Sequence, residues 1–182
     1  MRANVCLIGA AALALGACSS AGLEPVDQLR LASPRAVHSS VVLADGRALL
    51  IGGCVQGSCD AGPASATVDM VDAATGSVRP AGRLAMPRIG SAAVPLPGGK
   101  VLIVGGWAGS APTAASEIFD PATGRSAAAA PMAQPRADAM VALLADGRVL
   151  VAGGFDGSRR LGTAELFDPT TGRFVPAGSM AV

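Results

Sequence analysis

Aromatic side chains, histidine and lysine are scarce in this chain of 182 residues. It has no tyrosine, one tryptophan (Trp107), one histidine (His38) and one lysine (Lys100). A single histidine excludes a His-rich metal site, and any Ser-His-Asp triad would depend on His38 alone. The formal net charge of +1 gives no electrostatic reason to expect nucleic acid as a partner. We therefore expect no metal, no cofactor and no catalytic residue in this chain.

Glycine, proline and apolar residues are abundant instead. The chain contains 24 glycines and 13 prolines, and 51% of its residues are hydrophobic. An apolar fraction this large argues against global disorder, and the glycines lack the three-residue period of collagen. The length by itself suggests a single domain.

The first 17 residues have the pattern of a secretory signal peptide. Arg2 supplies a short positive region, and the uncharged apolar run over residues 5–15 follows it. This run is much shorter than the roughly 20 residues that a membrane-spanning helix needs. It ends in Leu-Gly-Ala-Cys at residues 15–18, followed by Ser19.

This ending resembles the lipobox of bacterial lipoproteins. The resemblance implies transfer of a diacylglyceryl group to the Cys18 thiol and cleavage before Cys18, with Ser19 favouring the outer membrane. Usual lipoboxes place Ala before Gly, and the order is reversed here. An ordinary secretory signal is the alternative. We expect a lipid-anchored protein of the bacterial cell envelope, periplasmic or surface-exposed, with residues 18–33 as a linker.

Cys54 and Cys59 form an even pair once residues 1–17 are removed and Cys18 carries lipid. In an oxidising compartment we expect them to form a disulfide, which would stabilise the fold by about 2 kcal/mol. Free thiols are the alternative. A metal site is disfavoured because two thiols with no nearby histidine do not fill a tetrahedral shell.

Three similar segments account for residues 34–182, with boundaries at 34–86, 87–134 and 135–182. Each begins with Pro-Arg, has a turn glycine eleven residues after the arginine, and a glycine pair six residues later. The pairs are Gly52 and Gly53, Gly105 and Gly106, and Gly153 and Gly154. The first segment has five extra residues, in the stretch that holds the cysteine pair.

Each segment predicts four short β-strands. The first two are apolar runs, such as residues 140–144 and 149–152, and Asp-Gly or Gly-Gly between them predicts two-residue hairpins. Because such runs are apolar throughout, we expect cover on both faces. The third strand alternates, as in residues 164–167, and the fourth, as in residues 174–175, should be short and weak. Four antiparallel strands at a repeat of about 48 residues indicate a propeller blade.

The segments resemble the kelch family of β-propellers in its bacterial form. The match is clearest over residues 136–174, as Arg…Leu-x-Asp-Gly-Arg-Val-Leu-Val-x-Gly-Gly…Thr-Ala-Glu-Leu-Phe-Asp-Pro-x-Thr-Gly-Arg-Phe. The resemblance covers residues 34–182 and implies an all-β fold of three four-stranded kelch-type blades after the signal peptide. Kelch blades usually carry a tyrosine in strand three and a tryptophan in strand four, where the third segment has Phe167 and Phe174.

Arg35, Arg88 and Arg136 recur in the loop that lies innermost in kelch propellers. Three arginines near a central channel could bind an anion or a carboxylate ligand. The alternative is that each pairs with a carboxylate within or between blades. Glu117 and Glu165 also recur, which favours a structural role in satisfying turn or neighbouring-blade donors.

Trp107 is a further candidate ligand-binding residue. It lies in one of the three variable loops between strands two and three, which are residues 54–66, 107–113 and 155–162. Variable loops on a rigid scaffold usually carry binding specificity. An exposed Trp107 could stack on a sugar ring or anchor a protein partner; otherwise it caps its blade.

Three blades are fewer than the four to eight with which propellers close. Open apolar faces predict self-association. We expect a truncated product or the front part of a longer propeller, with two chains assembling six blades as the alternative.

These features predict a cell-envelope protein, anchored to the membrane through Cys18, that binds a protein or glycan ligand and is not an enzyme. The alternative is the N-terminal fragment of a kelch-like propeller enzyme, galactose-oxidase-like or sialic-acid-epimerase-like, with catalytic residues beyond residue 182.

Overall fold

The computed structural model describes residues 31, 33–55, 59 and 63–180. The predicted signal peptide, Cys18, Ser19 and most of the linker lie outside the described residues. The described part is all-β, with three four-stranded antiparallel sheets, one two-stranded hairpin and no helix. It accordingly offers no helix that could cross a membrane.

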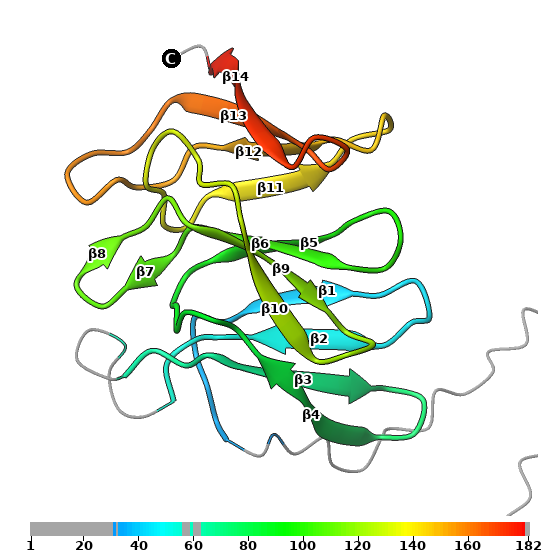
Figure 1. Cartoon of the computed structure of the whole chain (residues 1–182). Coiled ribbons are helices and arrows are strands. Elements are labelled where there is room, and N and C mark those ends of the chain that lie inside the picture. The colour runs from blue at the N-terminus through cyan, green and yellow to red at the C-terminus, as the bar shows by residue number, and fades with distance from the viewer. Residues whose placement is uncertain (1–30, 32, 56–58, 60–62, 181–182) are drawn as a thin grey trace, which may run out of the picture.

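Each four-stranded sheet is built from one repeat, and the three sheets are stacked from bottom to top in Figure 1. The first contains β1 (Ser39–Val42), β2 (Ala48–Ile51), β3 (Thr67–Asp72) and β4 (Ser77–Arg83). The second contains β5 (Ala92–Pro95), β6 (Val101–Val104), β9 (Ser116–Asp120) and β10 (Arg125–Ala129). The third contains β11 (Met140–Leu143), β12 (Val149–Ala152), β13 (Thr163–Asp168) and β14 (Arg173–Ser179). The sheets confirm the prediction of three four-stranded kelch-type blades.

The prediction of a short fourth strand is wrong. β4 and β14 are the longest strands, with seven residues each, and each continues past a register shift against the third strand. An outer edge strand is held by its backbone ladder and has one open edge, so it does not need the apolar runs on which the prediction relied. A second hairpin, β7 (Trp107–Ala108) with β8 (Ala111–Pro112), was not predicted at all.

The turns between the first two strands also differ from expectation. In the first blade the loop has three residues, closed by a hydrogen bond from Gly46 N to Leu43 O at 3.0 Å. Gly46 has φ 84°, whereas Asp45 keeps a negative φ. This is a type I turn followed by a left-handed glycine, which a three-residue hairpin loop requires. Gly147 closes the third blade's turn in the same way.

The core lies between the sheets, and β6 is buried along its whole length. Val101 and Ile103 pack against the first blade, while Leu102 and Val104 pack against the third. The expected cover on both faces is therefore confirmed for the middle blade.

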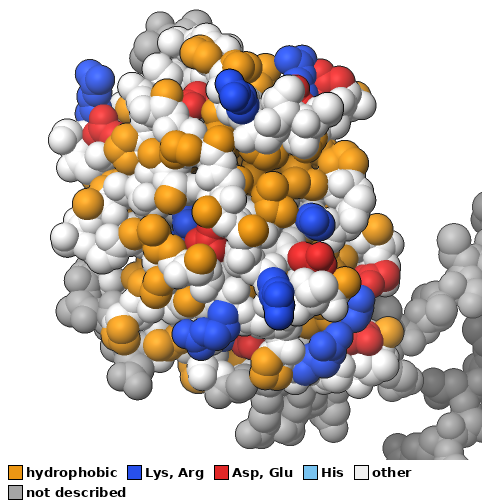
Figure 2. Space-filling model, viewed as in Figure 1, with side chains coloured by type: hydrophobic (Ala, Val, Ile, Leu, Met, Phe, Trp, Pro, Cys, Tyr) orange, Lys and Arg blue, Asp and Glu red, His pale blue; other side chains and the backbone are white. Residues whose placement is uncertain are grey.

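On the face shown in Figure 2, Lys and Arg side chains gather over the lower part, where Figure 1 places β3, β4 and β10.

The glycine pairs are the points at which one blade meets the next. Gly53 N donates to Arg88 O at 2.9 Å, and Gly106 N donates to Arg136 O at 2.8 Å. A Cβ placed on Gly105, whose φ is 62°, would overlap with Arg136 O. Both the left-handed backbone and the approach of the next blade therefore require glycine.

We expect Gly105→Ala to destabilise the fold far more than Gly172→Ala. Gly172 has φ 66°, so both variants incur left-handed strain of about 1–2 kcal/mol. Only at Gly105 does the new Cβ also meet the next blade, since nothing lies within 4 Å at Gly172. Urea unfolding of the two variants measures the difference, and equal losses of stability would contradict this explanation.

Candidate functional site

Each repeat arginine lies buried inside its own blade. Arg88 Nη2 is 2.7 Å from Glu117 Oε1, a residue of β9. Arg88 Nη1 donates to two backbone carbonyl oxygens, Gly105 O at 2.7 Å and Ala115 O at 3.0 Å. One guanidinium thus joins the entry loop, the end of β6 and the start of β9.

The same arrangement recurs in the other two blades. Arg136 Nη2 lies 3.2 Å from Glu165 Oε1, and Arg136 Nη1 donates to Gly153 O and Thr163 O, both at 2.8 Å. The first blade uses the shorter carboxylate, with Arg35 Nη2 2.5 Å from Asp69 Oδ2.

These contacts correct the ligand-binding interpretation of Arg35, Arg88 and Arg136. Their side chains are 2%, 0% and 0% exposed, and each guanidinium is bound to a carboxylate of the same blade. The observed arrangement is the alternative one, in which each arginine pairs within its blade. No anion site is assigned to these residues.

The glutamates link each blade to the segment that leads into it. Glu117 accepts hydrogen bonds from Ala85 N at 2.7 Å and Met86 N at 3.2 Å, both in the connection between β4 and Arg88. Glu165 accepts one from Ala133 N at 2.8 Å, in the corresponding connection of the third blade. The structural role predicted for both glutamates is confirmed.

Glu117 is held ionised by its neighbours. Burial disfavours its charged form, but hydrogen bonds from Ser126 Oγ, Ala85 N and Arg88 outweigh that penalty and lower the pKa of the carboxyl below its ordinary value. By repeat position, Ser126 of β10 is the counterpart of Phe174 in β14. The small hydroxyl therefore supplies a donor in place of an aromatic ring.

We expect Glu117→Gln to lower the free energy of unfolding at neutral pH by about 3–5 kcal/mol, because it leaves the Arg88 charge buried without its partner. The folded-state pKa of Glu117 lies below the unfolded value of 4.5, so its stabilisation is present above that pH. It is lost as the pH falls through the folded pKa. Chemical unfolding across this range should show the gap between wild type and variant narrowing in acid.

The matched control is Asp45→Asn, which removes an exposed partner of Arg47. Exposed pairs contribute little, so this variant should unfold much like the wild type at neutral pH. A gap between wild type and Glu117→Gln that stays constant with pH would contradict the ionised, buried pair.

The residue after each glycine pair occupies one equivalent position in all three blades. It forms an antiparallel bridge with the residue that follows the repeat arginine. The bridged pairs are Cys54 with Ala36, Trp107 with Ile89, and Phe155 with Ala137. Sequence reasoning missed this equivalence, although the place of each residue directly after Gly-Gly was a sufficient signal.

Trp107 and Phe155 come together across the second and third blades. Their ring centroids are 6.0 Å apart with a tilt of 35°, and both side chains are half-buried. Trp107 therefore packs at the junction between the second and third blades, and part of its side chain remains exposed to solvent. The neighbouring loop presents Arg159, whose side chain is 75% exposed, and the exposed Arg160.

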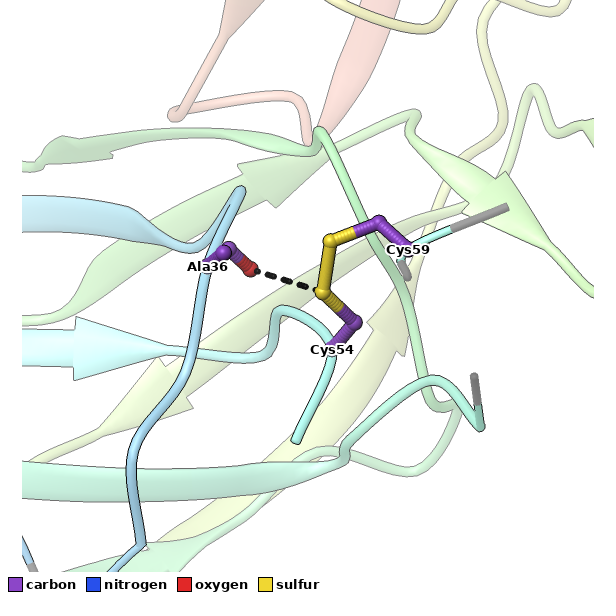
Figure 3. The surroundings of a disulfide bond; sticks show 3 residues. All are labelled: Ala36, Cys54 and Cys59. Atoms are coloured by element: carbon purple, nitrogen blue, oxygen red, sulfur yellow. Dashed lines mark hydrogen bonds between the residues drawn. A yellow bond between two sulfur atoms is a disulfide. The ribbon is translucent and has the colours of Figure 1, made fainter. Parts of the chain in front are cut away.

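In the first blade this position belongs to the predicted disulfide, which the structure confirms. Cys54 and Cys59 are bonded, with their Cα atoms 5.4 Å apart (Figure 3). Cys54 Sγ lies 3.5 Å from Ala36 O, along the dashed line in Figure 3. A disulfide sulfur has no hydrogen to donate, so we count this as a packing contact. A covalent bridge thus stands where the other blades have aromatic rings.

His38 lies against the first blade's glycine pair, where its Cβ would be 3.0 Å from a Cβ placed on Gly53. This position gives His38 a packing role at the first blade's glycine pair. Within the described ranges, no three His, Cys, Asp or Glu side chains are grouped so that they could hold a metal ion.

Comparison with known families gives one match. A family model for the Kelch motif matches residues 140–181, which run from β11 to just beyond β14. The match supports a kelch-repeat protein, and the fold extends the same blade to the two preceding repeats. A comparison with curated proteins found no match.

Proposed function

We propose that this chain is a binding module of a lipid-anchored protein in the bacterial cell envelope, and that it performs no chemistry itself. The observation that carries the proposal is that the contacts that hold the strands recur in every blade, whereas the loops differ. Glycine pairs and arginine–carboxylate contacts repeat from blade to blade, whereas the loops after the glycine pairs differ in length and in side chains. Variation confined to loops on a repeated scaffold is typical of a binding surface.

The chemistry of these loops suits a protein or glycan ligand. The β7–β8 hairpin and the loop before β13 lie on the same side of the stacked sheets (Figure 1). Trp107 and Phe155 offer partly exposed aromatic surface, and Arg159 and Arg160 add donors beside it. Aromatic residues and arginine dominate the energetics of protein interfaces, and an aromatic face also stacks on sugar rings.

We expect Trp107→Ala to abolish binding to a ligand identified by a glycan array or a pull-down screen. Because Trp107 also packs on Phe155, a second variant with no packing role is needed. Arg160→Ala alters only an exposed side chain and should weaken binding about tenfold or more.

Arg148→Ala is the control, since Arg148 is an exposed arginine in the turn between β11 and β12. It should bind as the wild type does. Circular dichroism confirms that each variant is folded. Unchanged affinity in both Trp107→Ala and Arg160→Ala would exclude these loops as the binding surface.

The lipid anchor is proposed from the sequence at residues 15–18. A single acyl chain gives only marginal membrane binding, so attachment of more than one chain at Cys18 would be required for stable anchoring.

Cys18→Ala should therefore release the protein from the membrane fraction without changing its fold. Incorporation of radiolabelled fatty acid into the wild type, and its absence from the variant, measures the modification directly. Equal membrane retention of the two proteins would contradict the anchor.

A further inference from the structure

The junctions between blades use one fixed set of backbone hydrogen bonds. At the first junction, Gly53 N donates to Arg88 O at 2.9 Å and Arg88 N donates to Ser65 O at 3.1 Å. A third bond joins the innermost loops, from Gly90 N to Val37 O at 3.0 Å. The earlier blade thus presents one N–H and two carbonyl groups, and the later blade presents their complements.

The second junction repeats all three bonds. Gly106 N donates to Arg136 O at 2.8 Å, Arg136 N donates to Thr113 O at 3.2 Å, and Asp138 N donates to Gly90 O at 2.9 Å. Since three of these five residue types differ from their counterparts at the first junction, the contact is specified by backbone geometry. These three backbone bonds do not depend on particular side chains, whereas the apolar packing between the sheets does.

The third blade carries the same set on its far face. By repeat position, its groups are Gly154 N, Leu161 O and Asp138 O. A hollow of about 760 Å³ lies beside them, lined among others by Gly153 and Met180. A Cβ on Gly153 would meet Met180 Cε at 3.4 Å and Leu161 O at 3.6 Å, and among the described residues no arginine carbonyl lies within 4 Å of it. The hollow therefore lies where the entry loop of the adjoining blade lies at the two internal junctions.

Two apolar side chains on the far face of the third blade are more exposed than their counterparts at the internal junctions. Leu84 and Met132 are 5% and 4% exposed at the two internal junctions, whereas Met180, their counterpart, is 49% exposed. Likewise Val94 of β5 is 7% exposed, and its counterpart Ala142 of β11 is only half-buried. The third blade thus has a docking face without a blade on it among the described residues.

The first blade holds the complementary groups at Arg35 and Val37. Val37 has φ 52°, close to the φ of 59° at Gly90 and 54° at Asp138. The N–H groups of Gly90 and Asp138 both donate to the preceding blade. A β-branched residue adopts a positive φ only at a cost in strain. Val37 therefore already has the conformation in which its N–H would donate to a preceding blade.

We propose that a second copy of this chain covers the third blade, with its own first blade in the position of a fourth. Arg35 O and Arg35 N of that copy bond to Gly154 N and Leu161 O, and its Val37 N bonds to Asp138 O. The contact is head to tail, so the reciprocal contact between the same two copies closes a ring. Two copies give six blades, within the four to eight that close a propeller.

Sedimentation equilibrium of the full chain in density-matched detergent tests the proposal. The wild type should sediment as a dimer. Ala142→Arg, on the far face of the third blade, and Ser40→Arg, on the outward side of β1, should each raise the dissociation constant more than about tenfold. Ala74→Arg adds the same side chain to an exposed turn and should leave the dimer intact.

A mixture of Ser40→Arg and Ala142→Arg chains separates this arrangement from a symmetric face-to-face dimer. In the mixture, one of the two head-to-tail contacts has both faces unaltered, so mixed dimers should form where neither variant associates alone. A monomeric wild type, dimers unaffected by both substitutions, open chains of more than two copies, or no rescue in the mixture would each overturn the proposal. None of these substitutions changes Trp107 or Arg160, so the dimer is tested with those side chains intact. Because Arg159 and Arg160 also line the hollow, a second copy there would compete with a ligand bound by these two arginines.

Discussion

The blade depends on one buried ion pair, which joins an arginine of the entry loop to a carboxylate of the third strand. In the second blade, Arg88 binds Glu117 and two backbone carbonyl groups, while the N–H and C=O of the same residue hold the preceding blade. Removing two charges from water is costly, and such a pair persists only when further hydrogen bonds satisfy both groups. The repeat supplies most of those bonds from its own backbone, although the Nε groups of Arg35 and Arg88 have no partner among the described residues.

This arrangement has a functional corollary. The arginine–carboxylate pairs buried in the blades are committed to structure, so the proposed binding function has to rest on other side chains. The position after each glycine pair supplies them, with a disulfide at Cys54, an indole at Trp107 and a phenyl ring at Phe155. All three are anchored by the same backbone bridge. A rigid frame therefore presents chemically different groups at equivalent points.

Much of the fold could be predicted because its determinants are local. Glycine pairs, turn glycines and apolar runs follow from short-range backbone requirements, and their spacing marks the repeats. The role of Arg35, Arg88 and Arg136 could not be chosen from sequence, because each finds its partner about 29 to 34 residues away across a sheet. Asp69 was missed as the partner of Arg35 because a five-residue insertion and a shorter side chain hide it. The length of β4 and β14 depends on an edge ladder that leaves no apolar signature.

The backbone character of the blade junctions bears on how such a chain can change over generations. The backbone bonds of a junction suit any blade that keeps the glycine pair and the positive φ of its inner loop, provided that its strands also pack apolar side chains against the neighbouring sheet. A duplicated repeat would then fit its neighbours without any new complementary side chains. The number of repeats can accordingly change by one whole repeat at a time, while the loop sequences of each repeat diverge independently.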